Sequence, residues 1–371
     1  MKYGILFLLA CALTSCQSTN TDVPQKIESP YSKQKILDII PRGLDLNQAP
    51  TRLAFASCFD QDKDASAWTQ LQSQNPDLMI MMGDNVYASQ AAKKPILQQY
   101  IKLEKLSTYR KFRETVPFLA TWDDHDYGVS DGDVTNPEKQ EARKAFTYHY
   151  PYIRDSTLLD QPGIFHSKIL GGVKEGRGRR ARVTPSLHVI MLDTRWNKTP
   201  WTKVPSADGT HQVITQSTDK KETILGDVQW EWLEDQLQIP TDFKIIVSSM
   251  QVLAEEHGYE RWGHFPHEKQ KLLNLIAKTK PKNLVILSGD RHFASHSKIE
   301  IPGWGPLYEM TSSPLNTPKG NITEVEKIYQ SEIFVKENYG IAEFDWKKKT
   351  ATFEIQDLEG KTIQKINLKM K

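Results

Sequence analysis

Six short apolar runs, each followed at once by polar or ionisable residues, limit what this chain can fold into. Their length and their aliphatic and β-branched content are typical of strands buried in a sheet. In open α/β sheets, ligands bind beyond the carboxyl ends of the strands. Residues that are distant in the sequence are therefore expected to meet at one sheet edge. The runs are TRLAFASC ending at Cys58, DLMIMMGD at Asp84, VPFLATWDDH at His125, LHVIMLDTR at Arg195, FKIIVSSMQ at Gln251 and NLVILSGDRH at His292.

Helical patterns lie between these runs, which predicts fold class α/β. The segments GDVQWEWLEDQL (226–237) and HEKQKLLNLIAK (267–278) combine spaced apolar residues with charged ones. The second begins with an acid and ends with a base, as the helix dipole favours. The tail, residues 339–368, reads as three strands joined by Asp-Trp-Lys-Lys and Leu-Glu-Gly-Lys turns. We expect a two-sheet sandwich with helices outside, forming one domain over residues 51–371.

The N-terminus is typical of an exported protein. MKYGILFLLACALTSC has one lysine and then an apolar stretch that is too short to span a bilayer as an ordinary helix. LTSC at 13–16 resembles a bacterial lipobox, which predicts a lipoprotein signal peptide at 1–15 and lipidation of Cys16. A plain signal peptide is the alternative. Residues 16–50, rich in Ser, Thr, Asn, Gln and Pro, are expected to form a tether, so that lipid is the sole membrane anchor.

Cysteine use and charge narrow the function classes further. Cys11 leaves with the signal peptide and Cys16 carries lipid, so Cys58 is the one remaining thiol and no internal disulfide is expected. The residue after Cys16 is Gln17, and not the Asp that retains some lipoproteins at the inner membrane. This favours a location at the outer membrane of the cell envelope, on either its periplasmic or its surface face. A net charge of +2 gives no electrostatic argument for nucleic-acid binding. The sequence indicates no particular oligomeric state.

The crowd of acids in FLATWDDHDYGVSDGD (118–133) indicates a cation site. Carboxylates packed so densely stay ionised only beside positive charge or water. Carboxylates prefer hard ions, whereas imidazole and thiolate favour transition metals. The mixture of these ligands at the strand ends therefore predicts two metal positions that share a carboxylate. Two metals about 3.5–4 Å apart form a clamp for displacement at phosphorus, and one of them lowers the pKa of a bound water from 15.7 to about 7.

The motifs also resemble a known family. GDNVY at 83–87, WDDHD at 122–126 and SGDRH at 288–292, with Cys58 upstream, are similar to the alkaline phosphatase D (PhoD-like) family of calcineurin-like metallophosphoesterases. LDTR, SSMQ, the GDVQWEWL helix and the ERWGHFP segment are weaker matches. The resemblance covers about 51–370. It implies an αββα sandwich with a dinuclear site and the hydrolysis of phosphate esters.

The resemblance assigns roles residue by residue. Asp84 would bridge the two metals, and His125 would donate a proton to the leaving alkoxide. As a mechanistic hypothesis beside these assignments, Arg195 would bind a non-bridging phosphoryl oxygen as a planar fork. The implied metal ligands are Cys58, Asp84, Tyr87, Asp124, Asp290 and His292. Asp123, Asp126 and Asp131 rank below these, as supporting residues or further ligands.

The ligand types suggest which metals are bound. A phenol with a pKa of about 10 is a poor ligand for a divalent ion, so Tyr87 with thiolate and imidazole points to Fe³⁺. The carboxylates point to Ca²⁺, Mg²⁺ or Mn²⁺ at the second position, and the resemblance implies iron and calcium. Related sequences often carry Asn-Asp after the DDH motif, where this chain has Ser130-Asp131. Asp131 or Asp133 would replace that Asn ligand.

Two function classes remain open from the sequence. The first is a phosphomonoesterase or phosphodiesterase that uses a metal-bound hydroxide on a phosphate ester substrate. The second is a catalytically degenerate envelope lipoprotein that binds a ligand or partner. A degenerate site has no reason to keep all five residues that the chemistry needs most, which favours the enzyme. Those residues are Cys58, Asp84, His125, Asp290 and His292.

Overall fold

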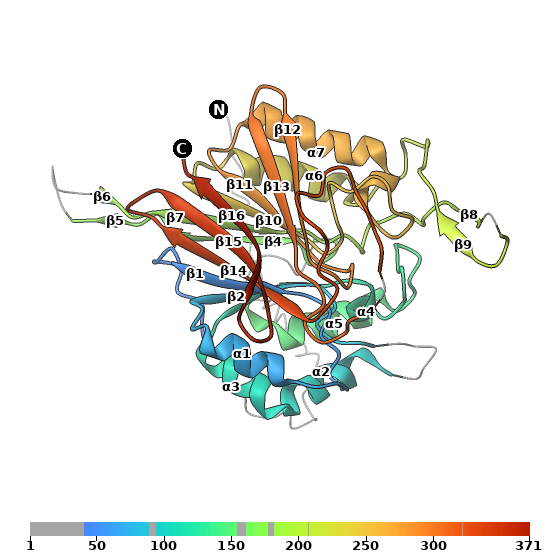
Figure 1. The fold of residues 1–371 in the computed structure, drawn as a ribbon, viewed down its shortest axis with the longest axis horizontal. Helices are drawn as coiled ribbons and strands as arrows, with labels where there is room; N and C mark the ends of the chain where they lie inside the picture. The colour runs from blue at the N-terminus through green and yellow to red at the C-terminus, as the bar shows by residue number, and fades with distance from the viewer. Residues whose placement is uncertain (1–40, 89–93, 154–160, 177–181, 207, 321) are drawn as a thin grey trace, which may run out of the picture. The chain divides into compact units, whose positions relative to one another are not determined.

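The computed structural model describes residues 41–371, apart from 89–93, 154–160, 177–181, 207 and 321 (Figure 1). The described residues belong to one compact unit, Asp38–Lys371. The predicted signal peptide, the predicted lipidation site Cys16 and the predicted tether up to residue 40 lie outside the described residues. Within the described ranges, no helix is both long and apolar enough to cross a membrane.

Two six-stranded sheets form the centre of this unit (Figure 1). In the first sheet, three parallel strands adjoin an antiparallel meander made by the tail. The three predicted tail strands are therefore confirmed. The order is β16 (Thr362–Lys369), β15 (Thr350–Asp357), β14 (Asn338–Asp345), β1 (Arg52–Ala56), β2 (Leu78–Met82) and β3 (Phe118–Thr121).

The second sheet has four parallel strands with an antiparallel strand at each edge. Its order is β12 (Ser295–Ile301), β13 (Gly305–Thr311), β11 (Leu284–Ser288), β10 (Phe243–Ser248), β7 (Ser186–Met191) and β4 (His166–Gly171). Two short hairpins extend from the sheets (Figure 1). They are β5 (Lys174–Glu175) with β6 (Arg182–Val183), and β8 (Lys203–Pro205) with β9 (Gln212–Ile214).

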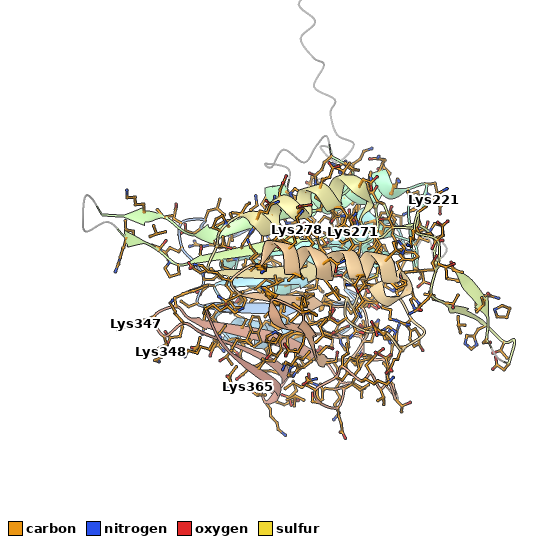
Figure 2. All side chains as sticks on the ribbon, turned by 90° about the horizontal axis from the view of Figure 1, so that it is seen from above. Lys221, Lys271, Lys278, Lys347, Lys348 and Lys365 are labelled. Atoms are coloured by element: carbon orange, nitrogen blue, oxygen red, sulfur yellow. The ribbon has the colours of Figure 1, made fainter. Side chains whose placement is uncertain are left out.

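Helices cover the outer face of each sheet, as Figure 1 shows. The predicted helices at 226–237 and 267–278 are confirmed as α6 and α7. Lys271 and Lys278 lie on the outer side of α7 (Figure 2), whereas Leu272 and Ile276 are buried beneath it. The first sheet carries α1 (Ser66–Ser73), α2 (Ile96–Lys105), α3 (Ser107–Thr115), α4 (Asp124–Tyr127) and α5 (Lys139–His149). The second carries α6 (Gly226–Gln238) and α7 (Pro266–Thr279), and the 3₁₀ turns are Pro151–Ile153 and Trp262–His264.

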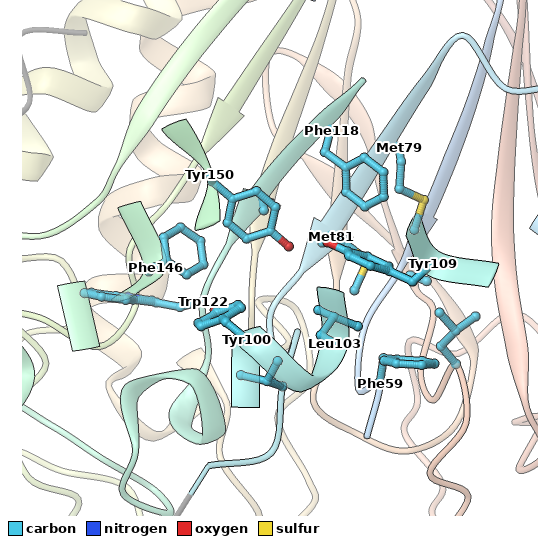
Figure 3. Packing of buried hydrophobic residues seen from close by; sticks show 14 of the residues in the cluster. Phe59, Met79, Met81, Tyr100, Leu103, Tyr109, Phe118, Trp122, Phe146 and Tyr150 are labelled. Atoms are coloured by element: carbon cyan, nitrogen blue, oxygen red, sulfur yellow. The ribbon is translucent and has the colours of Figure 1, made fainter. Parts of the chain in front are cut away.

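Three apolar layers hold the elements together. Along β1, Ala54 and Ala56 pack toward α1–α5, while Leu53 and Phe55 pack between the two sheets. This alternation follows from the two-residue period of a strand. Figure 3 shows the first layer, in which Trp122, Phe146 and other aromatic rings fill the space under the first sheet. A third layer lies between the second sheet and α6 and α7. The αββα sandwich is thus confirmed.

Candidate metal centre

The structure brings the predicted ligands from four strand ends together. Cys58 follows β1, Asp84 follows β2, Asp124 follows β3, and both Asp290 and His292 follow β11. The ligand atoms of Cys58, Asp84 and His292 lie within 4.8 Å of one another. Those of Asp123, Asp124 and Asp290 do so as well, and Asp84 also groups with Asp124 and His125. Two adjoining clusters therefore form, with Asp84 between them.

The backbone turns sharply at these positions. Four of the predicted ligands have a left-handed φ: 58° at Cys58, 52° at Asp84, 67° at Asp290 and 56° at His292. Non-glycine residues adopt this region rarely and at a cost of roughly 1–3 kcal/mol each. Main-chain bonds hold the first two turns together, because the amide of Cys58 donates to the carbonyl of Gly83 at 3.2 Å. The turns direct side chains from separate strands into one volume.

Gly83 is needed for this approach. Its φ is 108°, and a Cβ atom built there would lie 2.7 Å from the Cβ atom of Asp123. Only glycine tolerates both the positive φ and the close contact. The glycine in the GDNVY motif therefore allows the Asp84 loop to pack directly on the Asp123 loop.

The first cluster joins a thiol, a carboxylate, a phenol and an imidazole. Cys58 Sγ lies 3.5 Å from Asp84 Oδ2, and the Tyr87 hydroxyl lies 3.3 Å from the same oxygen and 3.5 Å from His292 Nε2. His292 Nδ1 is 2.5 Å from the carbonyl oxygen of Thr317 and donates its proton there. That contact fixes the tautomer and leaves Nε2 as an acceptor facing the cluster.

Burial dominates the electrostatics of both clusters. It raises the pKa of the Cys58 thiol, and the nearby Asp84 and Asp290 carboxylates raise it further. It also raises the pKa of Asp84, with Asp124 adding to the effect, and it raises the pKa of Asp290 to about 7. Burial lowers the pKa of His292 to about 3, which keeps the imidazole neutral. Positive charge is therefore required to hold the thiolate and the carboxylates ionised together.

The second cluster contains an orphaned oxygen. Asp123 is 1% exposed, and its Oδ2 has no hydrogen-bond partner among the described residues. A buried carboxylate oxygen without a partner is costly unless a cation faces it. Burial would raise the pKa of Asp124, but His125, Arg195 and two amides lower it to about 2, so that it stays ionised. The second cluster thus fits a hard cation.

Asp126 supports the ligand loops. Its carboxylate accepts from the amides of Asn85 and Asp123 at 3.0 Å and from the Tyr100 hydroxyl at 2.7 Å. These donors occupy both oxygens, so Asp126 is placed to hold the loops rather than to bind a metal. Asp131 lies at the rim, where its amide donates to Asp124 and its carboxylate pairs with Lys203, both at 2.8 Å.

His125 lies at the open side of the clusters. It is partly exposed, and its ring stacks on Tyr87 with centroids 4.1 Å apart and an angle of 29° between the planes. Its amide donates to Asp84 Oδ1 at 3.3 Å. The imidazole is therefore fixed next to the Asp84 carboxylate while solvent can still reach it.

Arg195 lies where it does not fit the role predicted for it. The side chain is 0% exposed, its Nε donates to Asp123 Oδ1 at 2.5 Å, and its two terminal nitrogens donate to Glu260 at 2.7 Å each. A guanidinium whose nitrogens are all engaged by carboxylates is not free to bind a phosphoryl oxygen as a fork. As placed, Arg195 holds Asp123 and Glu260 instead.

Glu260 is the site residue that sequence reasoning missed. Its carboxylate groups with those of Asp124 and Asp131, and it also accepts a hydrogen bond from the Trp201 indole. Glu260 begins the ERWGHFP segment, which is a weak family match. The position of Glu260 in that segment is the sequence signal that could have drawn attention to this acid. Glu260 does not directly follow a predicted strand, so it was not among the residues expected at the sheet edge.

Comparisons with known proteins identify relatives of this chain. Residues 53–354 match the family model described as PhoD-like phosphatase. Alkaline phosphatase D of Bacillus subtilis (strain 168) is 22% identical over 330 residues, covering 77% of this chain and 52% of that relative. The chain therefore spans about half the length of this curated relative.

Two solved structures share the fold. A structure of PhoD has a TM-score of 0.61 and 16% identity, covering 86% of this chain and 73% of its own. A purple acid phosphatase from yellow lupin seeds has a TM-score of 0.52 and 9% identity, covering 88% of this chain and 55% of its own. Both matches have the two-sheet architecture described above.

Proposed function

This chain belongs to the PhoD-like phosphatase family, and we propose that it hydrolyses phosphate esters at a two-metal centre. The observation that supports this most directly is the pair of adjoining clusters that share Asp84. Two metal ions bound there would supply a hydroxide nucleophile near neutral pH and neutralise the charge on the phosphoryl oxygens.

The two clusters would hold different metals. Cys58, Tyr87 and His292 would hold Fe³⁺ together with one oxygen of Asp84, because a thiolate, a phenolate and an imidazole suit a transition metal of high charge. Asp123, Asp124 and Asp290 would hold a harder ion with the other side of Asp84. Ca²⁺ is the first choice, with Mg²⁺ or Mn²⁺ as alternatives. The neutral Nε2 of His292 and the orphaned Oδ2 of Asp123 support this division.

His125 would protonate the leaving alkoxide. It is a partly exposed titratable group beside Asp84, and its stacking on Tyr87 fixes the imidazole plane. A proton donor must lie within hydrogen-bond reach of the leaving oxygen, directly or through a water. Arg195 would act as a positioning residue, because it donates hydrogen bonds that hold Asp123 and Glu260 in place.

The N-terminal pattern supports a location for this activity. Lipidation at Cys16 would anchor the domain to the cell envelope, most simply at the outer membrane. Phosphomonoesters and phosphodiesters reaching the periplasm or the cell surface would then be the substrates.

One experiment tests the proposal against the alternative of a ligand-binding lipoprotein. The full chain, purified in detergent, is assayed on p-nitrophenyl phosphate and bis-p-nitrophenyl phosphate, and its metals are measured by elemental analysis. We expect hydrolysis of at least one ester, with iron and a second metal bound. Inactivity on both esters, with no bound iron, would support the binding protein.

A further inference from the structure

We propose that the exposed ring of Tyr259, supported from beneath by Arg291, is a stacking platform for a planar aromatic group of a phosphodiester substrate. The inference rests on the proposed function and adds a substrate class to it. Four observations carry it: the exposure of the ring, the way it is held, its place beside the predicted ligands, and the chemistry of its free face.

Tyr259 is unusual among the aromatic residues of this chain. It is 64% exposed, and within the described residues it is the one aromatic side chain that is largely open to solvent. Burial of an aromatic ring normally contributes much to stability. A single exposed apolar residue needs no explanation by itself, so the significance lies in how this ring is held.

The ring and its backbone are fixed on several sides. The guanidinium carbon of Arg291 lies 4.5 Å from the centre of the Tyr259 ring, and Arg291 is itself buried and paired with Glu324. The Tyr259 amide donates to His257 Nδ1 at 3.2 Å, and its carbonyl accepts from His264 Nε2 at 2.7 Å. The protein therefore supports one face of an aromatic ring and leaves the remainder open.

Two neighbours of Tyr259 connect it to the candidate metal centre. Glu260, the next residue in the chain, groups with the carboxylates of Asp124 and Asp131. Arg291 lies between the predicted ligands Asp290 and His292 in the sequence. The Tyr259 ring is thus linked to the candidate centre through its neighbour in the chain, Glu260, and through Arg291. The proposal places one ester group of a bound phosphodiester over this ring.

The solvent-exposed face of the Tyr259 ring favours one chemical class of substrate. Aromatic side chains stack on planar rings whatever the edge groups of those rings, and a cation beneath the ring holds its orientation. A nucleobase and a simple arene share this property, whereas a small alkyl group does not. A diester carrying a planar group next to the phosphate is therefore the expected substrate.

The test keeps the leaving group constant and varies only the second ester group. The metal-loaded full chain is assayed on the p-nitrophenyl ester of thymidine 5′-phosphate and on methyl p-nitrophenyl phosphate. In Tyr259→Ala we expect kcat/KM for the thymidine ester to fall roughly 10-fold, in line with the loss of one stacked base. The methyl ester should change by less than about 2-fold, since its second ester group is a methyl with no ring to stack and the p-nitrophenyl leaving group is common to both substrates.

Control variants separate stacking from other effects. Tyr259→Phe keeps the ring and should keep the preference for the thymidine ester. Val228→Ala, at an exposed position on α6, should change neither ester. Equal losses on both esters in Tyr259→Ala would mean that the ring acts through Arg291 on the metal ligands, and would overturn the proposal, as would no loss at all. If the wild-type protein with bound metals hydrolyses p-nitrophenyl phosphate but neither diester, this proposal is wrong and the proposed function stands. If it hydrolyses none of the three esters, the proposed function itself is wrong.

Discussion

Arg195 and Glu260 form a two-point ion pair inside the protein, with both terminal nitrogens of Arg195 2.7 Å from Glu260 oxygens. Neither side chain has appreciable solvent exposure. Removal of one member of such a pair leaves an uncompensated buried charge. The Glu260→Gln substitution should therefore lower the free energy of unfolding by about 3 kcal/mol, as measured by urea denaturation. The partly exposed Glu234, which pairs with Lys278, provides the control. Glu234→Gln should change stability by less than about 0.5 kcal/mol, and equal effects of the two substitutions would contradict the prediction.

Tyr100→Phe tests the support of the ligand loops. The substitution removes the hydroxyl that donates to Asp126 at 2.7 Å and should cost about 1–2 kcal/mol of stability. Because Asp126 holds Asn85 and Asp123 beside the ligands, we also expect kcat to fall about 10-fold through small misplacement, with KM little changed. Tyr339→Phe removes a comparable hydrogen bond, to Gln356, which is not a predicted ligand. It should lose stability without losing kcat, and a fall in kcat there would argue against a specific role for Tyr100.

His125→Ala should reduce turnover while the bound metals stay at wild-type levels. General acid catalysis contributes typically about 10²–10⁴-fold. Its share grows with the basicity of the leaving group, so the loss should be greater on glycerol phosphate than on p-nitrophenyl phosphate. Steady-state kinetics on the two esters, with elemental analysis of the variant, provides the measurement. A loss of the same size on both would assign His125 a role other than proton donation.

Asp84→Ala should remove metal from both positions, because Asp84 groups with ligand residues of both clusters. Asp290→Ala, which affects the second cluster, should retain more iron than Asp84→Ala. Elemental analysis of the two variants, purified in parallel with the wild type, decides the point. Full retention of iron in Asp84→Ala would refute the bridging assignment.

Stability should decrease as the pH falls from 7 to 5, and His149 is one cause. Burial, followed by the charge of Arg113, lowers the pKa of His149 to about 4 from an ordinary value of 6.5. Between these values the unfolded chain binds a proton that the folded chain does not, so acid favours unfolding. The expected loss is on the order of 2 kcal/mol between pH 7 and pH 5 for this residue.

Urea unfolding at the two pH values measures this dependence. His149→Gln should reduce the difference in unfolding free energy between pH 7 and pH 5, and His211→Gln, at an exposed loop position, serves as the control. An unchanged pH dependence in His149→Gln would rule out the assignment.

The strand-end argument predicted much of the site, because the carboxyl ends of parallel strands must meet at one edge. It succeeded in bringing Cys58, Asp84, Asp124 and Asp290 together, since each directly follows a buried apolar run. Turn residues in the tail likewise predicted three strands. The edge strands β4 and β12 were not predicted, because their sequences, HSKILG and SHSKIEI, alternate polar and apolar residues less clearly than the buried runs do.

Arg195 and Glu260 show where sequence reasoning ends. A conspicuous arginine after a strand suggests a phosphate ligand, but the direction of its fork depends on which carboxylates surround it. Here two acids, 72 residues before and 65 residues after Arg195 in the sequence, occupy its nitrogens. Tertiary packing determines which groups the guanidinium binds, and neither the spacing nor the residue type shows this in the sequence.

The donor set of the candidate centre is divided between the two sheets. Cys58, Asp84 and Asp124 extend from the first sheet, whereas Asp290 and His292 extend from the second. The complete set therefore exists only after most of the chain has been synthesised and the second sheet has packed on the first. Metal capture then belongs to the end of maturation, and a half-finished chain offers an incoming ion an incomplete and unselective set of ligands.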